Sequence, residues 1–329
     1  MKHFFFIFLI STCPLLAQLG GTHSFSFLQL NTSPRATALG GYLSSGLDGD
    51  INNGIYNPSL INPLMTNQLG LNFTNYYSGT TYGDIGYCFR VDDYQLISSI
   101  KFIDYGQFDE TNEFGQLIGE FGAGEYVFSL ATNTIIDSTF YVGLNGKLAY
   151  SSLYQLNSLA VFLDLACTYF HPHSNLNINM IIKNVGYQLD TYYEDQRESF
   201  PFEFLVGVSN KLEHMPLRWH LTFQHLEKPD LMFDNTAQTS FLNNNTVFNG
   251  ILNHFVLGLE FLIHQNCSFL MGYNNRRRSE MIIENRRGLV GFSTGFLIKI
   301  KRFNLAYSIS VNHLSGTIST FGITTRLKK

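Results

Sequence analysis

The sequence predicts an all-β fold, a 14-stranded antiparallel transmembrane β-barrel preceded by an N-terminal plug segment. Three observations predict it. The chain begins with a leader for export, its body alternates apolar and polar residues in long segments, and its long connections all fall on one side of the predicted barrel. Together they describe a chain that crosses a membrane with strands rather than helices.

The first 17 residues form a secretory signal peptide. Lys2 and His3 precede the apolar run 4–10, and the letters LLAQ close the leader. A short basic region, a short apolar region and a small residue before the cut are the parts of such a leader. We expect cleavage after Ala17, so the mature chain leaves the cytoplasm.

The composition of the exported chain is typical of a barrel. Charged residues make up 14% of the chain, below the ~25% of soluble domains, and aromatic residues reach 15%. Beyond the leader no apolar run approaches the ~20 residues that a membrane helix needs. On composition alone a large secreted β-sandwich stays the alternative. The net charge of -4 gives no reason to expect nucleic acid.

Strand periodicity runs from residue 67 to the end of the chain. In LNINMIIKN (176–184), Ile178 and Met180 alternate with Asn179 and Lys183, as expected where successive side chains point to opposite faces. Most segments of this kind have ten or more residues, the length that a tilted strand needs to cross a bilayer. The predicted strands are 67–77, 82–91, 94–103, 125–134, 138–150, 156–170, 175–186, 200–212, 217–226, 252–264, 267–275, 288–301, 302–312 and 316–327.

The connections between these strands are sorted by length. The even-numbered connections are turns of a few residues, whereas the odd-numbered ones include all the long stretches, 104–124, 187–199, 227–251 and 274–287. Outer-membrane barrels have short periplasmic turns and long outer loops. A sandwich has no reason to sort its connections in this way, so we predict a barrel with both of its ends in the periplasm.

Residues 18–66 precede the first strand and are expected to plug the lumen. They show little strand alternation and include the Ala/Gly-rich run 34–46. A barrel of fourteen strands lies between the ~8 strands whose interior side chains can fill and the ~16 strands that leave a water channel. We therefore predict three parts, the signal peptide 1–17, the plug 18–66 and the outer-membrane barrel 67–329.

No motif predicts catalysis, a metal or a cofactor. GFSTG (291–295) has the spacing of a nucleophile elbow around Ser293, but it lies inside a strand pattern with no helix after it. The histidines, among them His220 and His225, supply no converging set of three or four zinc ligands and are expected on the surface or at interfaces. The chain is therefore not expected to be an enzyme.

The outer connections carry contrasting charge. Residues 104–125 hold six acidic residues and no basic one. The connection 274–287 holds five arginines, which are Arg276, Arg277, Arg278, Arg286 and Arg287. Guanidinium groups bind phosphate and carboxylate oxygens in a bidentate manner. This cluster is a candidate outer-surface contact for lipopolysaccharide or a partner protein, and the alternative is a solvated loop.

The stretch SSGLDGDINNGIYNPSL (44–60) begins like a calcium loop, with Asp48 and Asp50 at alternate positions. An EF-type loop needs a bidentate glutamate at its twelfth position, which counted from Asp48 is Ser59. A looser calcium site stays a minor hypothesis, to be dropped if the two aspartates point at backbone amides or at Arg35. The favoured interpretation is a connection between plug and barrel.

The stretch GTHSFSFLQLNTSPRATALGG (21–41), followed by DGDINNGIYNPSLI, resembles the PorQ family of FadL-like outer-membrane barrels of the type IX secretion system. The matching residues are Ser33, Pro34, Arg35, Gly40, Gly41, Asp48, Asp50, Asn57 and Pro58. The specific match covers about residues 20–65, and the architecture agrees over the whole chain. Ser59 stands where the family has alanine, and the chain ends TTRLKK without the terminal aromatic residue typical of barrel insertion.

The resemblance implies a non-enzymatic role in protein export in the Bacteroidetes lineage. Such a barrel would hold a PorZ-like surface protein at the outer face, with other type IX components near the machinery that attaches cargo to lipopolysaccharide. The alternative is a FadL-type channel for hydrophobic small molecules. A channel needs a continuous apolar pocket and a lateral opening, whereas a scaffold needs outer loops shaped for a protein and tolerates a blocked lumen.

Overall fold

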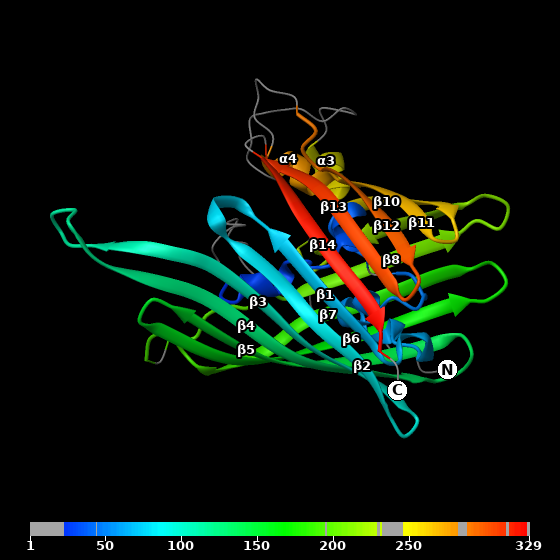
Figure 1. Cartoon of the computed structure of the whole chain (residues 1–329), viewed down its shortest axis with the longest axis horizontal. Helices are drawn as coiled ribbons and strands as arrows, with labels where there is room; N and C mark the ends of the chain where they lie inside the picture. The colour runs from blue at the N-terminus through cyan, green and yellow to red at the C-terminus, as the bar shows by residue number, and fades with distance from the viewer. Residues whose placement is uncertain are drawn as a thin grey trace, which may run out of the picture.

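A computed structural model describes residues 23–43, 45–194, 196–228, 231, 246–281, 288–313 and 316–327. Its strands form one closed barrel, in which each strand pairs with its neighbours in sequence and β1 pairs with β14 (Figure 1). The predicted all-β, 14-stranded antiparallel barrel is therefore confirmed. The predicted signal peptide lies outside the described residues.

The strands are numbered in chain order. The first seven are β1 (Gln68–Asn75), β2 (Thr81–Val91), β3 (Tyr94–Thr111), β4 (Leu117–Ile135), β5 (Phe140–Leu153), β6 (Leu156–His171) and β7 (Leu176–Asp190). The other seven are β8 (Glu203–Lys211), β9 (Leu217–Phe223), β10 (Phe255–His264), β11 (Cys267–Asn274), β12 (Phe292–Ile300), β13 (Phe303–His313) and β14 (Gly316–Arg326).

Strand alternation places apolar side chains on the outside of the wall. On β6, Val161, Leu163 and Leu165 are exposed, whereas Asp164 and Ala166 point inward and are buried. Exposed Leu, Ile, Phe and Tyr side chains recur in this way on most of the strands. A continuous apolar belt around a barrel with a polar interior is the pattern of a protein that sits in a bilayer.

One of the predicted outer connections is wrong. Residues 104–124 are not a long loop, because β3 and β4 continue past the wall and meet at a tight turn. The side-chain oxygen of Asn112 accepts hydrogen bonds from the amides of Phe114 and Gln116, and Gly115 adopts a φ of 76°. This turn allows two charged segments to pair as strands.

The chain also contains short helices. They are η1 (Ser26–Gln29), α1 (Pro34–Ala38), α2 (Ile51–Tyr56), η2 (Pro58–Leu60), η3 (Pro63–Met65), η4 (Tyr77–Gly79), α3 (Thr246–Asn253) and α4 (Asn275–Met281). Among the described residues, no helix is both long and apolar enough to cross a membrane.

The described residues 23–43 and 45–66, named here the inner segment, lie inside the barrel. Helix α1 contacts β11 to β14, α2 contacts β1 to β3, and η2 contacts β4 to β6, so the segment touches walls on different sides of the lumen. Its apolar side chains are buried against the wall; Leu39 packs with Leu270, and Ile51 packs with Ile97. The protein core is therefore the contact between the inner segment and the barrel.

Candidate functional site in the barrel lumen

Helix α1 positions Arg35 in the lumen. The Ser33 hydroxyl accepts a hydrogen bond from the Ala36 amide, and Pro34 occupies the first helical position, where its missing N–H is not needed. Gly40 and Gly41 end the helix with φ values of 96°, a left-handed conformation that glycine adopts without strain. The stretch 33–41 around Arg35 is thus a complete helix with both of its caps.

Arg35 is the centre of a buried ion-pair network. Its Nη1 lies 2.7 Å from Asp48 Oδ2 and its Nη2 lies 2.9 Å from Glu260 Oε2 on β10. Arg218 on β9 contacts the same two carboxylates at 3.0 and 3.2 Å. Asp50 is more distant, with its Oδ2 3.6 Å from Arg35 Nη1. Two arginines and three carboxylates therefore join the inner segment to the wall.

Burial and charge pairing shift the pKa values of the two aspartates in opposite directions. Burial by itself would raise the pKa of Asp48, but the guanidinium groups of Arg35 and Arg218 outweigh it and hold that pKa below its ordinary value. Burial raises the pKa of Asp50, and the more distant Arg35 only partly offsets it. Burial would lower the pKa of Arg35, but Asp48 and Glu260 raise it well above its ordinary value.

The calcium hypothesis is wrong for Asp48 and Asp50. Both carboxylates point at Arg35, and the Asp50 side chain also caps α2 by accepting from the Asn52 amide at 3.1 Å. Asp48 further accepts from the side chain of Asn53 at 2.7 Å. A carboxylate already paired with a guanidinium is a poor ligand for a cation, and the aspartates serve the helix and the ion-pair network instead.

Asn57 and Pro58 form a second contact between the inner segment and the wall. The Asn57 side-chain oxygen accepts from the Ser59 amide at 3.0 Å, and the Ser59 hydroxyl lies 2.7 Å from the Thr168 hydroxyl on β6. Pro58 begins η2 beneath Gly143 of β5. A Cβ at Gly143 would stand 2.2 Å from the Ser59 amide nitrogen, so only glycine allows this approach.

Ser293 tethers the end of α1 to β12. Its hydroxyl donates to the Ala38 carbonyl at 2.9 Å and accepts from the Gly40 amide at 3.0 Å. The backbone here also lies against Gly272 of β11, where an added Cβ would stand 2.1 Å from the Gly40 nitrogen. The residue in the GFSTG motif is therefore occupied by hydrogen bonds to the inner segment.

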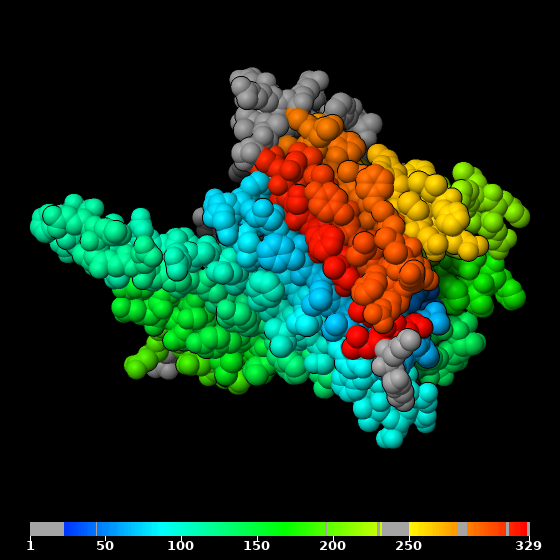
Figure 2. Space-filling view, viewed as in Figure 1, coloured from blue at the N-terminus to red at the C-terminus, as the bar shows by residue number. Residues whose placement is uncertain are grey.

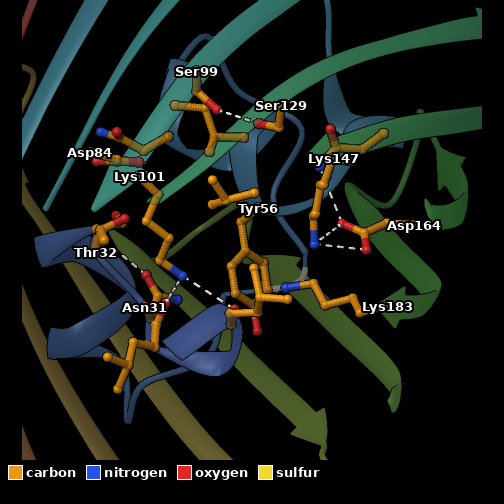
Figure 3. A pocket seen from close by; sticks show the side chains of 17 residues that line it. Asn31, Thr32, Tyr56, Asp84, Ser99, Lys101, Ser129, Lys147, Asp164 and Lys183 are labelled. Atoms are coloured by element: carbon orange, nitrogen blue, oxygen red, sulfur yellow. Dashed lines mark hydrogen bonds and ion pairs between the residues drawn. The ribbon is translucent and has the colours of Figure 1, made fainter. Parts of the chain in front are cut away.

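Three lysines converge on a small cavity in the middle of the lumen. Figure 3 shows Lys101, Lys147 and Lys183 reaching toward it from β3, β5 and β7, with Tyr56 of α2 between them. Lys147 Nζ lies 2.6 Å from Asp164 Oδ2, and Lys183 Nζ lies 3.2 Å from the centre of the Tyr56 ring. The cavity has a volume of about 60 Å³, room for a few water molecules.

Two larger cavities lie at the ends of the barrel. One of about 660 Å³ opens among the short turns and is lined by Arg35, Asp48 and Arg302. The other, of about 340 Å³, lies among the long connections and is lined by Tyr42 and Arg277. Residues of the inner segment line the central cavity and both end cavities. The segment therefore stands between the two ends of the lumen.

The described arginines of α4 do not form an exposed patch. Arg276 pairs with Glu280 at 2.7 Å, and Arg277 donates to the Ser310 hydroxyl at 2.8 Å. Arg278 is only 7% exposed and donates to backbone carbonyls near the start of β12. Arg286 and Arg287 lie outside the described residues. Arg276 therefore pairs within α4, whereas Arg277 and Arg278 face neighbouring segments at the long-connection end.

Several lumen residues were not identified as a site from the sequence. Glu260 and Arg218 belong to the ion-pair network. The sequence indicated them only by a charged side chain within an otherwise largely apolar strand segment. The expectation for the histidines holds for His173 and His214, which are exposed, and is wrong for His220 and His225, which are 2% and 5% exposed. His220 lies 3.6 Å from Glu260, and His225 lies 2.9 Å from Glu227. The position of His220 between Trp219 and Leu221, in the alternation of its strand, is the signal that could have indicated the inward face.

Comparison with known proteins supports the fold. No family model matches the chain, and no curated protein matches it. Among solved structures, the CymD monoaromatic hydrocarbon channel is 10% identical and matches with a TM-score of 0.55 over 92% of this chain and 99% of its own. A Pseudomonas aeruginosa FadL homologue is 9% identical, with a TM-score of 0.50 over 90% of this chain and 98% of its own. The barrel is therefore FadL-like in fold.

Proposed function

We propose that this chain is a non-enzymatic outer-membrane barrel that acts as a scaffold for protein secretion, with its lumen closed by its own inner segment. The observation that carries the proposal is the ion-pair network of Arg35, Asp48 and Glu260, which holds the segment across the lumen. The resemblance of residues 20–65 to the PorQ family gives the process, type IX secretion, and the partner class, a PorZ-like surface protein.

The character of the lumen supports a scaffold rather than a conduit. Polar and charged side chains make up most of the lining of the central cavity, which also includes Leu28, Leu30, Ile55 and Val127. The apolar residues of the inner segment pack against the wall in closed clusters. A ligand site for a hydrophobic molecule is a concave, mostly apolar pocket of several hundred Å³. The segment would have to leave its ion pairs before such a molecule could pass.

A FadL-type channel for hydrophobic small molecules is the second candidate, and the comparisons favour it over the first. One of the solved structures similar in fold is described as a monoaromatic hydrocarbon channel. The wall also has an irregularity of the kind that a lateral opening needs. Residues 184–190 of β7 have no partner on β8, and the pairing of β6 with β7 shifts between Leu163 and Leu165.

A deletion of the gene tests the two candidates against each other. The scaffold role predicts that cargo proteins accumulate in the periplasm or lose their surface attachment, while growth on a hydrophobic substrate and its uptake stay normal. Affinity purification of the tagged barrel should then recover other secretion components. Normal secretion together with lost uptake of a monoaromatic hydrocarbon would reject the scaffold role and establish the channel.

Complementation with a matched pair of variants sharpens the test. Gly143→Ala brings a Cβ against the inner segment, whereas nothing lies within 4 Å of a Cβ added at Gly146 on the same strand. If secretion depends on the closed barrel, the first variant restores it poorly and the second restores it fully. If both variants restore secretion equally, secretion does not depend on the placement of the inner segment.

A further inference from the structure

The outer halves of β3 and β4 form an arm that pairs with no other strand among the described residues. β2 accompanies β3 only as far as Asp104, and β5 accompanies β4 only from Ala123 onward. Residues 105–122, named here the β3–β4 arm, are therefore a two-stranded ribbon with both edges free. Figures 1 and 2 show this arm projecting from the body of the barrel, on the side away from the C-terminal end of β14.

The arm carries only negative charge. Its ionisable acids are Asp109, Glu110, Glu113 and Glu120, and it contains no lysine or arginine. Asp109 and Glu120 stand directly opposite each other in the strand register. Like charges in this position destabilise a strand pair, so the arrangement does not serve the stability of the free arm. A positively charged partner would relieve the repulsion.

The tip of the arm is apolar and exposed. Phe114 is 86% exposed, and Leu117 and Ile118 are 62% and 61% exposed. These residues lie beyond the parts of β3 and β4 that pair with β2 and β5. Acidic residues flank them on both strands of the arm. An exposed apolar centre with a charged rim is the arrangement of a protein interface.

Aromatic contacts at the base of the arm, including one from the β5–β6 turn, hold it in place. Phe108 and Phe121 stack with ring centres 5.4 Å apart, and Tyr154 in the β5–β6 turn packs edge-on against Phe121 at 4.7 Å. The Tyr154 hydroxyl also donates to Glu110 at 2.5 Å. With the hydrogen-bonded turn at Asn112, these contacts fix the direction of the arm before any partner binds, which lowers the entropy lost on binding.

We propose that the β3–β4 arm is a docking element for a protein whose contact surface combines basic side chains with an apolar pocket for the tip. The negative charge of the arm argues against lipid phosphates as the occupant, because lipopolysaccharide is itself anionic. The inference deepens the scaffold role and rests on it for the nature of the partner. It adds which part of the barrel meets that partner and what chemistry recognises it.

Site-specific photo-cross-linking in intact cells tests the proposal. A photoreactive phenylalanine derivative replaces Phe114, and the same group replaces Tyr193, an exposed residue of the β7–β8 connection, as the control. We expect a discrete protein adduct from position 114 and none of the same mass from position 193. The cross-linked peptide, sequenced by mass spectrometry, should carry lysine or arginine beside an apolar residue.

Neutralisation of the exposed acids tests the charge requirement. The triple variant Asp109→Asn, Glu113→Gln, Glu120→Gln should lower the adduct yield about fivefold, since three exposed charge pairs contribute little each but act together. Glu110 is left in place because it holds Tyr154. The control variant Asp92→Asn, Asp93→Asn, Glu213→Gln neutralises three exposed acids at the short turns and should leave the yield unchanged.

The outcomes separate this inference from the scaffold role. Adducts to lipid alone, no adduct at position 114, or a yield that ignores the arm charges would overturn the docking proposal, even if deletion of the gene blocks secretion. Normal secretion in the deletion strain together with a charge-dependent adduct would reject the scaffold role and keep the docking element. Heat-dependent gel migration confirms that each variant contains a folded barrel.

Discussion

Arg35 and Glu260 form a buried ion pair that joins positions 225 residues apart in the chain. Their Nη2 and Oε2 atoms lie 2.9 Å apart, and the two side chains are 5% and 3% exposed. Asp48 and Arg218 complete the network on either side of this pair. Since buried charges are stable only when they are paired, the position of the inner segment depends on these contacts.

Replacement of Arg35 by methionine should destabilise the protein strongly. Glu260 and Asp48 would keep Arg218 but lose their shorter contacts, and breaking a buried pair from one side costs roughly 3–5 kcal/mol. We expect a loss of that size in the free energy of unfolding, measured by urea titration in bilayers. Arg90→Met is the control, because its pair with Asp93 is exposed and such pairs contribute about 1 kcal/mol or less.

The double variant Arg35→Met, Glu260→Met provides a second control. It removes one positive and one negative buried charge together, so it should recover part of the stability that the single variant loses. If the loss in the double variant equals the sum of the losses in Arg35→Met and Glu260→Met, the two residues do not act as a pair.

Acid should loosen the inner segment through Asp48. The pKa of Asp48 is lowered in the folded protein, so the contribution of this carboxylate to stability is present above its ordinary pKa of about 4. That contribution is lost as the pH falls below about 4 toward the folded pKa, because the displaced segment then binds the proton more readily. Hydrogen exchange of the inner-segment amides measures the effect, and Asp48→Asn should abolish it.

Asp50 should show the opposite dependence. Its pKa is raised in the folded protein, so its contribution to stability is present below the ordinary pKa and is lost as the pH rises through the folded pKa. Above about pH 4 the contribution of Asp48 is complete, so the protection of the α2 amides should fall with rising pH across that interval, and Asp50→Asn should abolish this fall. Protection that stays flat with pH in the unsubstituted protein would show that Asp50 keeps its ordinary pKa.

The fold could be predicted from the sequence because the pattern that marks a wall strand lies within about ten consecutive residues. In a strand that faces lipid on one side and the lumen on the other, every second residue reports its environment, and β6 shows this with Val161, Leu163 and Leu165. The arm was missed for the same reason. Its outer residues face water on both sides, so the alternation that marks a wall strand disappears between Asp104 and Ala123.

The ion-pair network could be predicted only in part. Arg35, Asp48 and Asp50 lie close in sequence and were identified together, and the hypothesis that the aspartates point at Arg35 agrees with the structure. Their partners Arg218 and Glu260 depend on how the α1 helix sits against β9 and β10. That placement follows from packing over the whole barrel, which the spacing of nearby residues in the sequence does not indicate.

The contact between Lys183 and Tyr56 should depend on the aromatic ring. The ammonium nitrogen lies 3.2 Å from the ring centre, and Lys183 is only 8% exposed. A cation over an aromatic face in a desolvated place contributes up to about 2 kcal/mol. Tyr56→Leu should therefore lower the free energy of unfolding by about that amount, whereas Tyr56→Phe keeps the ring and should remain near the wild-type value. Equal losses in the two variants would assign the contribution to the hydroxyl. A loss in neither variant would show that the aromatic ring does not stabilise Lys183.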